Sequence, residues 1–267
     1  MKLHTVYIAI ALSFLNLLKA YSQETDNAES LSNRTAYSVP RGNFEFGIFQ
    51  PLRYGVSDKV ELAAHPILIF LDPQLKAKIR LKKVKGYQLS SEHGFSFPTP
   101  LLRTFQMKGA GGLVSPQYEI PVMVSIYNGL ILSRMFGRFS VATVKAGFSI
   151  ALGSGNLEES SSIDFPLIYP RLLPFYHQPV IDLALDFRSE VMKSFFYLIT
   201  TEGFIAPGSS ENLFFEHRGN IGWKPDQKFM LQLGYRLCFG KYPYGAQWHL
   251  LPDFDVAFRL SPKRKSE

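Results

Sequence analysis

Apolar and basic residues alternate without interruption from Leu75 to Lys82, in the run Leu-Lys-Ala-Lys-Ile-Arg-Leu-Lys. The two residue types separate onto opposite faces only at a period of two, which is the side-chain period of a β-strand. The run therefore predicts a strand that faces an apolar medium on one side and water on the other. Its polar face consists of Lys76, Lys78, Arg80 and Lys82.

The same alternation returns along most of the chain and predicts about twelve strands, with Thr35–Val39 counted as the first. Residues 66–73 show no clear sidedness and are left unassigned. Residues 151–179 interrupt the rhythm with four prolines, so we predict one long loop there, a candidate plug or lid. The other predicted strands fall within 43–53, 60–65, 75–82, 87–97, 120–126, 142–150, 181–188, 194–201, 215–223, 228–239 and 254–260.

Loop lengths follow the parity of the strands. Connections after even-numbered strands are short (54–58, 84–86, 132–137, 189–192, 224–227), whereas those after odd strands include long ones (98–117, 151–179, 204–212, 240–249). Outer-membrane barrels separate short turns from long loops in this way, and strands of about 10 to 12 residues suit a tilted crossing of the hydrocarbon layer. The predicted fold class is all-β, a single antiparallel up-and-down transmembrane β-barrel of about 12 strands.

The chain begins with the pattern of an exported protein. A short basic start, an apolar run and a small-x-small site predict a cleaved signal peptide at residues 1–22. A polar N-terminal segment (23–34), the barrel (35–260) and a polar basic tail (261–267) complete the predicted organisation. No later apolar run is long enough for a membrane-spanning helix, so a membrane protein of this sequence has to cross with strands. We therefore expect a bacterial outer-membrane location.

Composition and motifs give no sign of catalysis. The formal charge of +7 comes from basic residues that alternate with apolar ones, so nucleic acid is not an expected partner. The single cysteine, Cys238, excludes an intrachain disulfide framework and a cysteine-based zinc site. No histidine pair has metal-ligand spacing, and no nucleophile elbow or phosphate loop is present. We therefore predict no enzyme activity and no catalytic, cofactor-binding or metal-binding residues.

The turn Tyr-Gly-Val-Ser-Asp-Lys-Val-Glu-Leu at 54–62, set among alternating strands, resembles bacterial outer-membrane β-barrels. The likeness is to the small transporter-like group, which includes the phenol-degradation MetA-pathway and fatty-acid-transporter-like barrels. It implies outer-membrane lipid and the barrel assembly machinery as partners. The chain departs from the pattern at its end, where Leu260 and a polar tail follow Phe258.

A barrel with apolar residues outside places the basic strand in the lumen. A Lys or Arg that faces mid-bilayer lipid costs roughly 2 to 4 kcal/mol, so four such residues on one strand are expected to point inward. The predicted lumen or solute-facing residues are Lys76, Lys78, Arg80, Lys82, Glu61, Glu92, Asp182 and Asp186.

Two interpretations of these charges are open. In one, the barrel is a pore or transporter for a small anionic or amphipathic solute that favours the basic wall. In the other, ion pairs fill a narrow lumen and nothing passes. A soluble exported β-sandwich or ligand-binding barrel, and an outer-membrane lipid-modifying enzyme, are the alternative classes.

Overall fold

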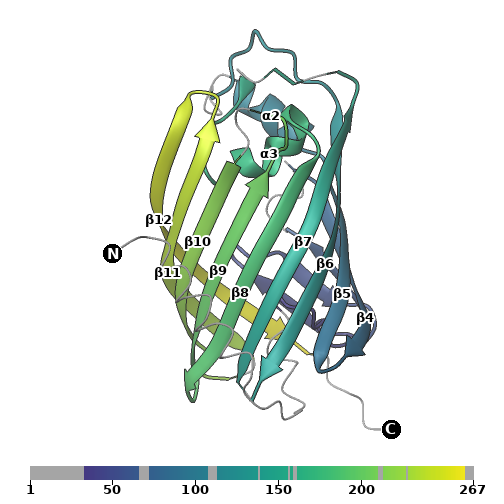
Figure 1. Ribbon diagram of the computed structural model, residues 1–267, viewed down its shortest axis with the longest axis vertical. Coiled ribbons are helices and arrows are strands. Elements are labelled where there is room, and N and C mark those ends of the chain that lie inside the picture. The colour runs from purple at the N-terminus through teal and green to yellow at the C-terminus, as the bar shows by residue number, and fades with distance from the viewer. Residues whose placement is uncertain are drawn as a thin grey trace.

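Twelve antiparallel strands close into one barrel in the computed structural model (Figure 1). The structure describes residues 33–65, 72–107, 113–137, 139–155, 157–158, 161–209, 213–226 and 228–261. Each strand pairs with its neighbours in sequence, and β1 closes the ring against β12, so the predicted fold class is confirmed. The elements are β1 (Phe44–Gly47), β2 (Leu52–Gly55), β3 (Val60–Ala64), β4 (Gln74–Val84), β5 (Tyr87–Ser96), α2 (Thr99–Gln106), β6 (Met123–Phe136), β7 (Ser140–Gly153), α3 (Tyr169–Tyr176), β8 (Val180–Met192), β9 (Phe195–Ile205), β10 (Leu213–Trp223), β11 (Phe229–Tyr242) and β12 (Gly245–Leu260).

The two ends of the barrel differ, as the loop parity predicts. One end, here called the turn end, carries the short connections that follow β2, β4, β6, β8 and β10. The other, the loop end, carries α2 and α3 (Figure 1). The expectation of a long loop at 240–249 is wrong: β11 and β12 continue to Tyr242 and from Gly245, because Phe239 and Trp248 pair across the strands with ring centroids 4.8 Å apart.

The first strands differ from the prediction in two ways that cancel in the strand count. Thr35–Val39 is not a strand, and 43–53 is divided between β1 and β2. The break falls at 48–51, where Pro51 has no N–H to donate and the Phe49 N–H donates to the Asp255 carboxylate of β12 at 3.0 Å instead of to a backbone carbonyl.

The outer surface is mostly apolar. Polar side chains on it bond to one another: His93 Nδ1 lies 2.7 Å from the Asn128 amide oxygen, and Thr201 Oγ1 lies 3.0 Å from His217 Nδ1. A soluble protein rarely exposes an apolar surface of this extent, whereas lipid would cover it. The exposed residues include Leu75, Leu130, Val144, Phe148, Leu183, Leu185, Ile199, Ile221, Leu233, Leu250 and Phe254.

Helices contribute little to the molecule. In the part of the chain that the structure describes, neither helix is long and apolar enough to cross a membrane. Both pack at the loop end, where Leu102 of α2 and Leu172 of α3 belong to one buried apolar cluster. The fold therefore consists of a strand wall with a small helical cap.

Candidate functional site

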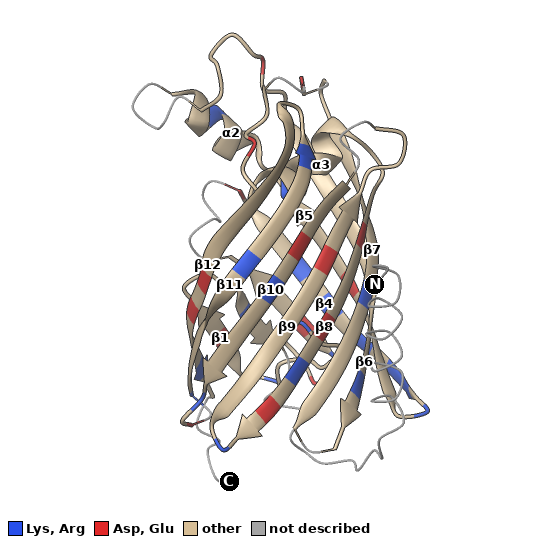
Figure 2. Ribbon diagram, turned by 60° about the vertical axis from the view of Figure 1, so that its left-hand side comes forward, with Lys and Arg blue, Asp and Glu red and all other residues tan. Residues whose placement is uncertain are grey.

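The inner face of the wall is polar, opposite in character to the outer face. The strands from β3 to β12 alternate across these two faces because their side chains have a period of two, apart from register shifts in β4 and β8. Acidic and basic positions lie on neighbouring strands in the middle of the wall (Figure 2). Buried inner residues include Glu45, Arg53, Glu61, Lys78, Ser90, Ser133, Thr143, Asp186, Arg188, Thr200, Glu202, Glu216, Asn220, Gln232 and Asp255.

Two of the predicted basic residues on β4 are neutralised by the predicted acids of neighbouring strands. Lys78 Nζ lies 3.1 Å from Glu61 Oε2, and both side chains are buried. Lys76 and Lys145 both lie 3.5 Å from Glu92 Oε1. These carboxylates thus compensate much of the basic wall that the sequence predicts.

The other two basic residues of β4 have different surroundings. Arg80 lies opposite Ser90 and acts electrostatically on Tyr37, which puts it on the inner face. The register shifts between Arg80 and Lys83, so Lys82 falls within a β-bulge and Lys83 takes the position opposite buried Gln88. Strict alternation does not reveal such a shift, because an extra residue reverses the facing of all that follows.

The predicted acids of β8 both lie on the inner face, and a residue from outside the wall contacts one of them. Asp186 Oδ1 accepts hydrogen bonds from Thr200 Oγ1 at 2.6 Å and from Arg34 Nε at 2.7 Å. Asp182 is in the electrostatic neighbourhood of Glu202 and Lys145. The positively charged partner of Asp186 therefore comes from the N-terminal part of the chain.

Residues 33–43, here called the lumenal segment, cross the interior of the barrel. Thr35 to Val39 are buried, with Ala36 and Val39 fully inaccessible. The surrounding strands bind the backbone of the segment through inward side chains. Ser90 Oγ donates to the Ala36 carbonyl at 2.6 Å, the Ala36 N–H donates to Ser133 Oγ at 2.8 Å, the Val39 N–H donates to Glu61 at 2.8 Å, and Lys78 Nζ donates to the Thr35 carbonyl at 3.2 Å.

The lumenal segment is held by the polar contacts above and by one small apolar cluster, in which Tyr37 packs with Val141 and Met135. Its strand-like contact with the wall is at its end, where Arg41 bridges to Gly55 and the Gly42 N–H donates to the Gly55 carbonyl at 2.7 Å. An added Cβ at Gly55 would lie 2.1 Å from the Pro40 carbonyl oxygen, so this close approach requires glycine.

Ion pairs fill the lumen on the opposite wall. Arg34 also reaches Glu202 at 3.1 Å, and Arg218 reaches the same carboxylate at 2.9 Å. Glu216, fully buried, lies 3.5 Å from Arg218 and 3.6 Å from Arg236. The described lumen thus has interleaved charges of both signs, and it is not uniformly basic.

Helix α3 lies within the predicted 151–179 loop and packs across the loop end of the barrel. Tyr169 is fully buried, with its ring 5.2 Å from Phe214 and 5.6 Å from Tyr242. Arg171 extends to Glu216 at 3.3 Å. The helix therefore contacts the inner wall, as a lid would.

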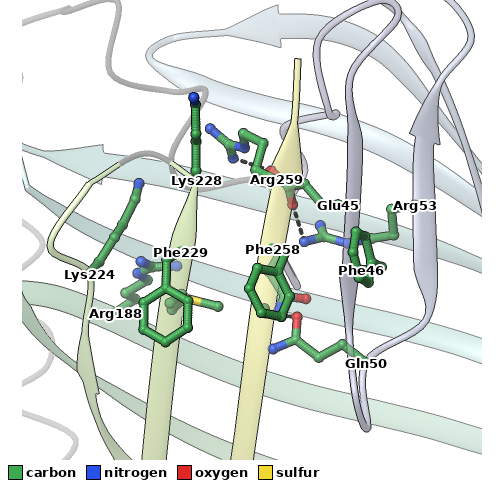
Figure 3. A pocket seen from close by; sticks show the side chains of 13 residues that line it. Glu45, Phe46, Gln50, Arg53, Arg188, Lys224, Lys228, Phe229, Phe258 and Arg259 are labelled. Atoms are coloured by element: carbon green, nitrogen blue, oxygen red, sulfur yellow. Dashed lines mark hydrogen bonds and ion pairs between the residues drawn. The ribbon is translucent and has the colours of Figure 1, made fainter. Parts of the chain in front are cut away.

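A pocket remains at the turn end, bordered by the start of the lumenal segment (Figure 3). It encloses about 420 Å³, part of it open to solvent. Five cations from four parts of the wall line it, and Glu45 is the one carboxylate among the described lining residues. Glu45 forms ion pairs with both Arg53 and Arg259. The cations are Arg53, Arg188, Lys224, Lys228 and Arg259.

Metal binding has no structural support in the described ranges, where no group of three or more His, Cys, Asp or Glu side chains could hold an ion. The features that sequence reasoning missed are the lumenal segment and the turn-end pocket. Arg188 and Arg259 stand at alternating positions of predicted strands and could have been assigned inward by the same rule as β4. No pattern in the sequence predicts the contact of Arg34 with the wall, because a polar stretch before the first strand resembles any exposed terminus.

These observations define a closed membrane-type β-barrel with an occupied lumen. No family model matches the chain, and no curated protein matches it in sequence. Several solved outer-membrane proteins have a distantly similar structure. OccAB2 of Acinetobacter baumannii has 10% identity and a TM-score of 0.41, with 80% of this chain and 54% of that chain covered.

The outer-membrane channel DcaP of Acinetobacter baumannii has 9% identity and a TM-score of 0.36, covering 90% of this chain and 66% of DcaP. OpdK of Pseudomonas aeruginosa, solved with vanillate, has 8% identity and a TM-score of 0.39, covering 82% and 56%. The chain therefore spans about half to two thirds of the length of these proteins. Likenesses this distant do not assign a function to it.

Proposed function

We propose that this protein is an outer-membrane channel for small solutes whose lumen is closed by the lumenal segment. The observation that carries the proposal is the way the segment is held. It crosses a charged lumen and its backbone bonds to inward side chains of the wall, such as Ser90 and Ser133. The wall is closed by strand pairing of its own and does not need the segment for its ladder.

The polar contacts of the lumenal segment favour a closure of the lumen that can be reversed. A hydrogen bond within a protein contributes only about 0.5 to 1.5 kcal/mol net, because water replaces it when it breaks. The groups that hold Ala36 and Val39 would be hydrated in an open lumen. The apolar contact that opening would break is small: among the described residues it is the cluster of Tyr37 with Val141 and Met135. An apolar plug would instead have to expose its core to water on leaving.

The membrane location is part of the proposal. Apolar side chains such as Leu185 and Leu233 are half exposed on the outer face, whereas the charges point inward. This arrangement supports an outer-membrane barrel that is exported through the predicted signal peptide at residues 1–22, which lies outside the described residues. Membrane fractionation and a heat-dependent shift in gel mobility test the location, and a soluble protein without the shift would contradict it.

Membership of the small transporter-like group is a further part of the proposal, supported by the turn residues at 54–62. The structure gives that stretch the form of a tight connection from β2 to β3, in which the Val56 N–H donates to the Val60 carbonyl at 2.9 Å. A preference of the β4 wall for anions also stays a proposal, carried by Lys76 and Arg80. Unchanged ion selectivity after neutralising both would contradict it.

A reversible cross-link tests closure directly. Ala36→Cys and Ser133→Cys bring two thiols together where the Ala36 N–H now meets Ser133 Oγ at 2.8 Å, in a Cys238→Ser background. Mass spectrometry confirms that the oxidised protein is cross-linked. In planar bilayers we expect no current from the oxidised protein and step-like openings after reduction. Openings in both states would show that the segment does not close the lumen. Silence in both states, and in variants with a weakened segment, would overturn the channel itself.

A further inference from the structure

We propose that the turn-end pocket is a binding site for a small oxyanion, a carboxylate or a phosphate, coordinated by Arg188, Lys224, Lys228 and Arg259. The inference deepens the proposed channel function by naming a solute class. It rests on that function only for the statement that the bound anion is also the solute that passes.

The first observation is an excess of positive charge in one small space. Glu45 shares its carboxylate between Arg53 and Arg259, so one negative charge serves two positive ones. In the described part of the chain, Lys224 and Lys228 form no ion pair. Glu190 on β8 is the other acid that acts electrostatically on Lys224 and Arg188.

The second observation is a buried guanidinium with donors to spare. Arg188 is 5% exposed, and its Nε and Nη2 atoms have no hydrogen-bond acceptor among the described residues. Its guanidinium carbon lies 4.0 Å from the centre of the Phe196 ring, which holds the side chain in place without satisfying its N–H groups. Buried donors are nearly always satisfied, so donors of this kind indicate a missing acceptor.

The geometry suits an oxyanion. Arg188 comes from β8, Lys224 and Lys228 flank the connection from β10 to β11, and Arg259 lies near the end of β12 (Figure 3). Guanidinium groups bind carboxylate and phosphate through parallel N–H donors, and ammonium groups add charge without fixed direction. The pocket also borders Phe229, so an anion with an apolar body has a surface to cover.

The electrostatics of the connection agree with this geometry. Burial, together with the nearby charges of Arg259 and Arg188, lowers the pKa of Lys224 to about 8, against the opposing effect of Glu190 and Glu45. An ammonium group disfavoured in this way gains most from an added anion.

Calorimetric titration tests the site with benzoate and inorganic phosphate as probes, on the full chain in phosphatidylcholine nanodiscs. We expect saturable binding of at least one probe, weakened about tenfold or more in Arg188→Gln/Lys224→Gln/Lys228→Gln. The matched control is Lys59→Gln/Lys85→Gln, which removes two exposed lysines from other connections of the same end and should leave the affinity within about twofold. Lys224→Gln alone, outside any strand, guards against misfolding of the triple variant.

Nanodiscs that contain phosphatidylglycerol separate a soluble ligand from a lipid headgroup. The site's oxyanion is a lipid phosphate if these nanodiscs abolish binding of the probes both to the native protein and to the Lys59→Gln/Lys85→Gln control. The lipid then competes at the pocket and not at the exposed lysines of the other connections. Absence of binding by both probes and by anionic lipid, or equal binding in native protein and triple variant, would overturn the site. Conductance is measured separately, so a silent barrel that binds the anion would refute the channel and leave the site standing.

Discussion

Arg34 and Asp186 are 152 residues apart in sequence, and Arg34 Nε donates to Asp186 Oδ1 at 2.7 Å inside the barrel. This contact joins the N-terminal part of the chain to β8, a third of the way around the ring from β4, where the lumenal segment also binds. The segment is therefore tied to two separate parts of the wall. Its two anchorages make the closure testable by single substitutions.

Removing the guanidinium should loosen the segment. Arg34→Gln leaves Asp186 with its bond from Thr200 and Glu202 with its pair to Arg218, so the wall keeps its charges compensated while the segment loses two ion pairs. Loss of one partner of a buried ion pair costs about 3 to 5 kcal/mol. Because Arg34 is partly exposed to water, we expect the free energy that holds the segment against the wall to fall by an amount at the low end of this range.

We expect more frequent openings of Arg34→Gln in planar bilayers and little change in the unfolding of the wall. Arg41→Gln is the matched control, because Arg41 lies in the same segment with its side chain exposed. An Arg34 variant as quiet as the Arg41 variant would contradict the anchoring role.

Gly55 offers a steric test of the same closure from the opposite wall. In Gly55→Ala the new Cβ would lie 2.1 Å from the Pro40 carbonyl oxygen, and this contact with backbone forces the segment to move. We expect increased conductance and faster amide hydrogen exchange at residues 36–39. Gly203→Ala is the control, since its Cβ would meet nothing closer than 3.8 Å, and equal behaviour of the two variants would count against the close approach.

Alternation in the sequence was sufficient to predict the barrel, because lipid outside and water inside impose a period of two on every spanning strand. It also predicted inward positions for Glu61, Glu92 and Asp186, whose carboxylates form ion pairs with Lys78, Lys76 and Arg34. The rule failed where no strand pairing decides the conformation. Thr35–Val39 has a pattern that suits a strand, yet its backbone groups bond to side chains of the lumen, and no local pattern distinguishes the two.

The character of the lumen was harder to predict than its position. Lys78 and Glu61 stand on adjacent predicted strands, but whether they pair depends on a register that the sequence does not fix. The Lys82 bulge has the same origin. The turn-end pocket draws on β2, β8 and β12, which meet only when the barrel closes, so its charge excess is a property of the closed ring and not of any one stretch.

The cap at the loop end should depend on one buried ring. Tyr169→Ala removes a fully buried side chain that packs on Phe214 and Tyr242, and such deletions cost about 3 to 5 kcal/mol. We expect α3 to detach locally and become sensitive to protease, with the strand wall intact. Phe165→Ala, at a ring that is 40% exposed, should leave the cap protected. Equal cleavage of both variants would contradict the docking of α3.

The lipid-facing surface can be tested by an outward charge. Leu185→Arg places a guanidinium in the middle of β8, at a side chain that is 50% exposed on the outer face. In a bilayer it should lower the free energy of unfolding by about 2 to 4 kcal/mol, and Val191→Arg at the turn end by about 0 to 1 kcal/mol, because the cost depends on depth. Denaturant titration in liposomes measures both. Equal small effects would mean that the outer face meets water.

The proposed anion site should weaken as Lys224 loses its proton. Below its pKa of about 8 the ammonium is charged and contributes to binding; as the pH rises through that value the charge is lost from the free protein, so the affinity falls. Benzoate is the suitable probe, since it stays ionised over this range whereas phosphate does not. The groups that face Lys224 are Arg188 and Glu190 of β8, Arg259 of β12 and Glu45 of β1, and the arginines keep their charge throughout.

We expect the affinity for benzoate to fall between pH 7 and 9 by no more than about tenfold per pH unit, the limit for one linked proton. In Lys224→Gln the affinity should start lower and change less over the same range. Binding of benzoate to the native protein that is independent of pH would remove Lys224 from the site. A variant that keeps the full pH dependence would assign the linked proton to another group of the pocket.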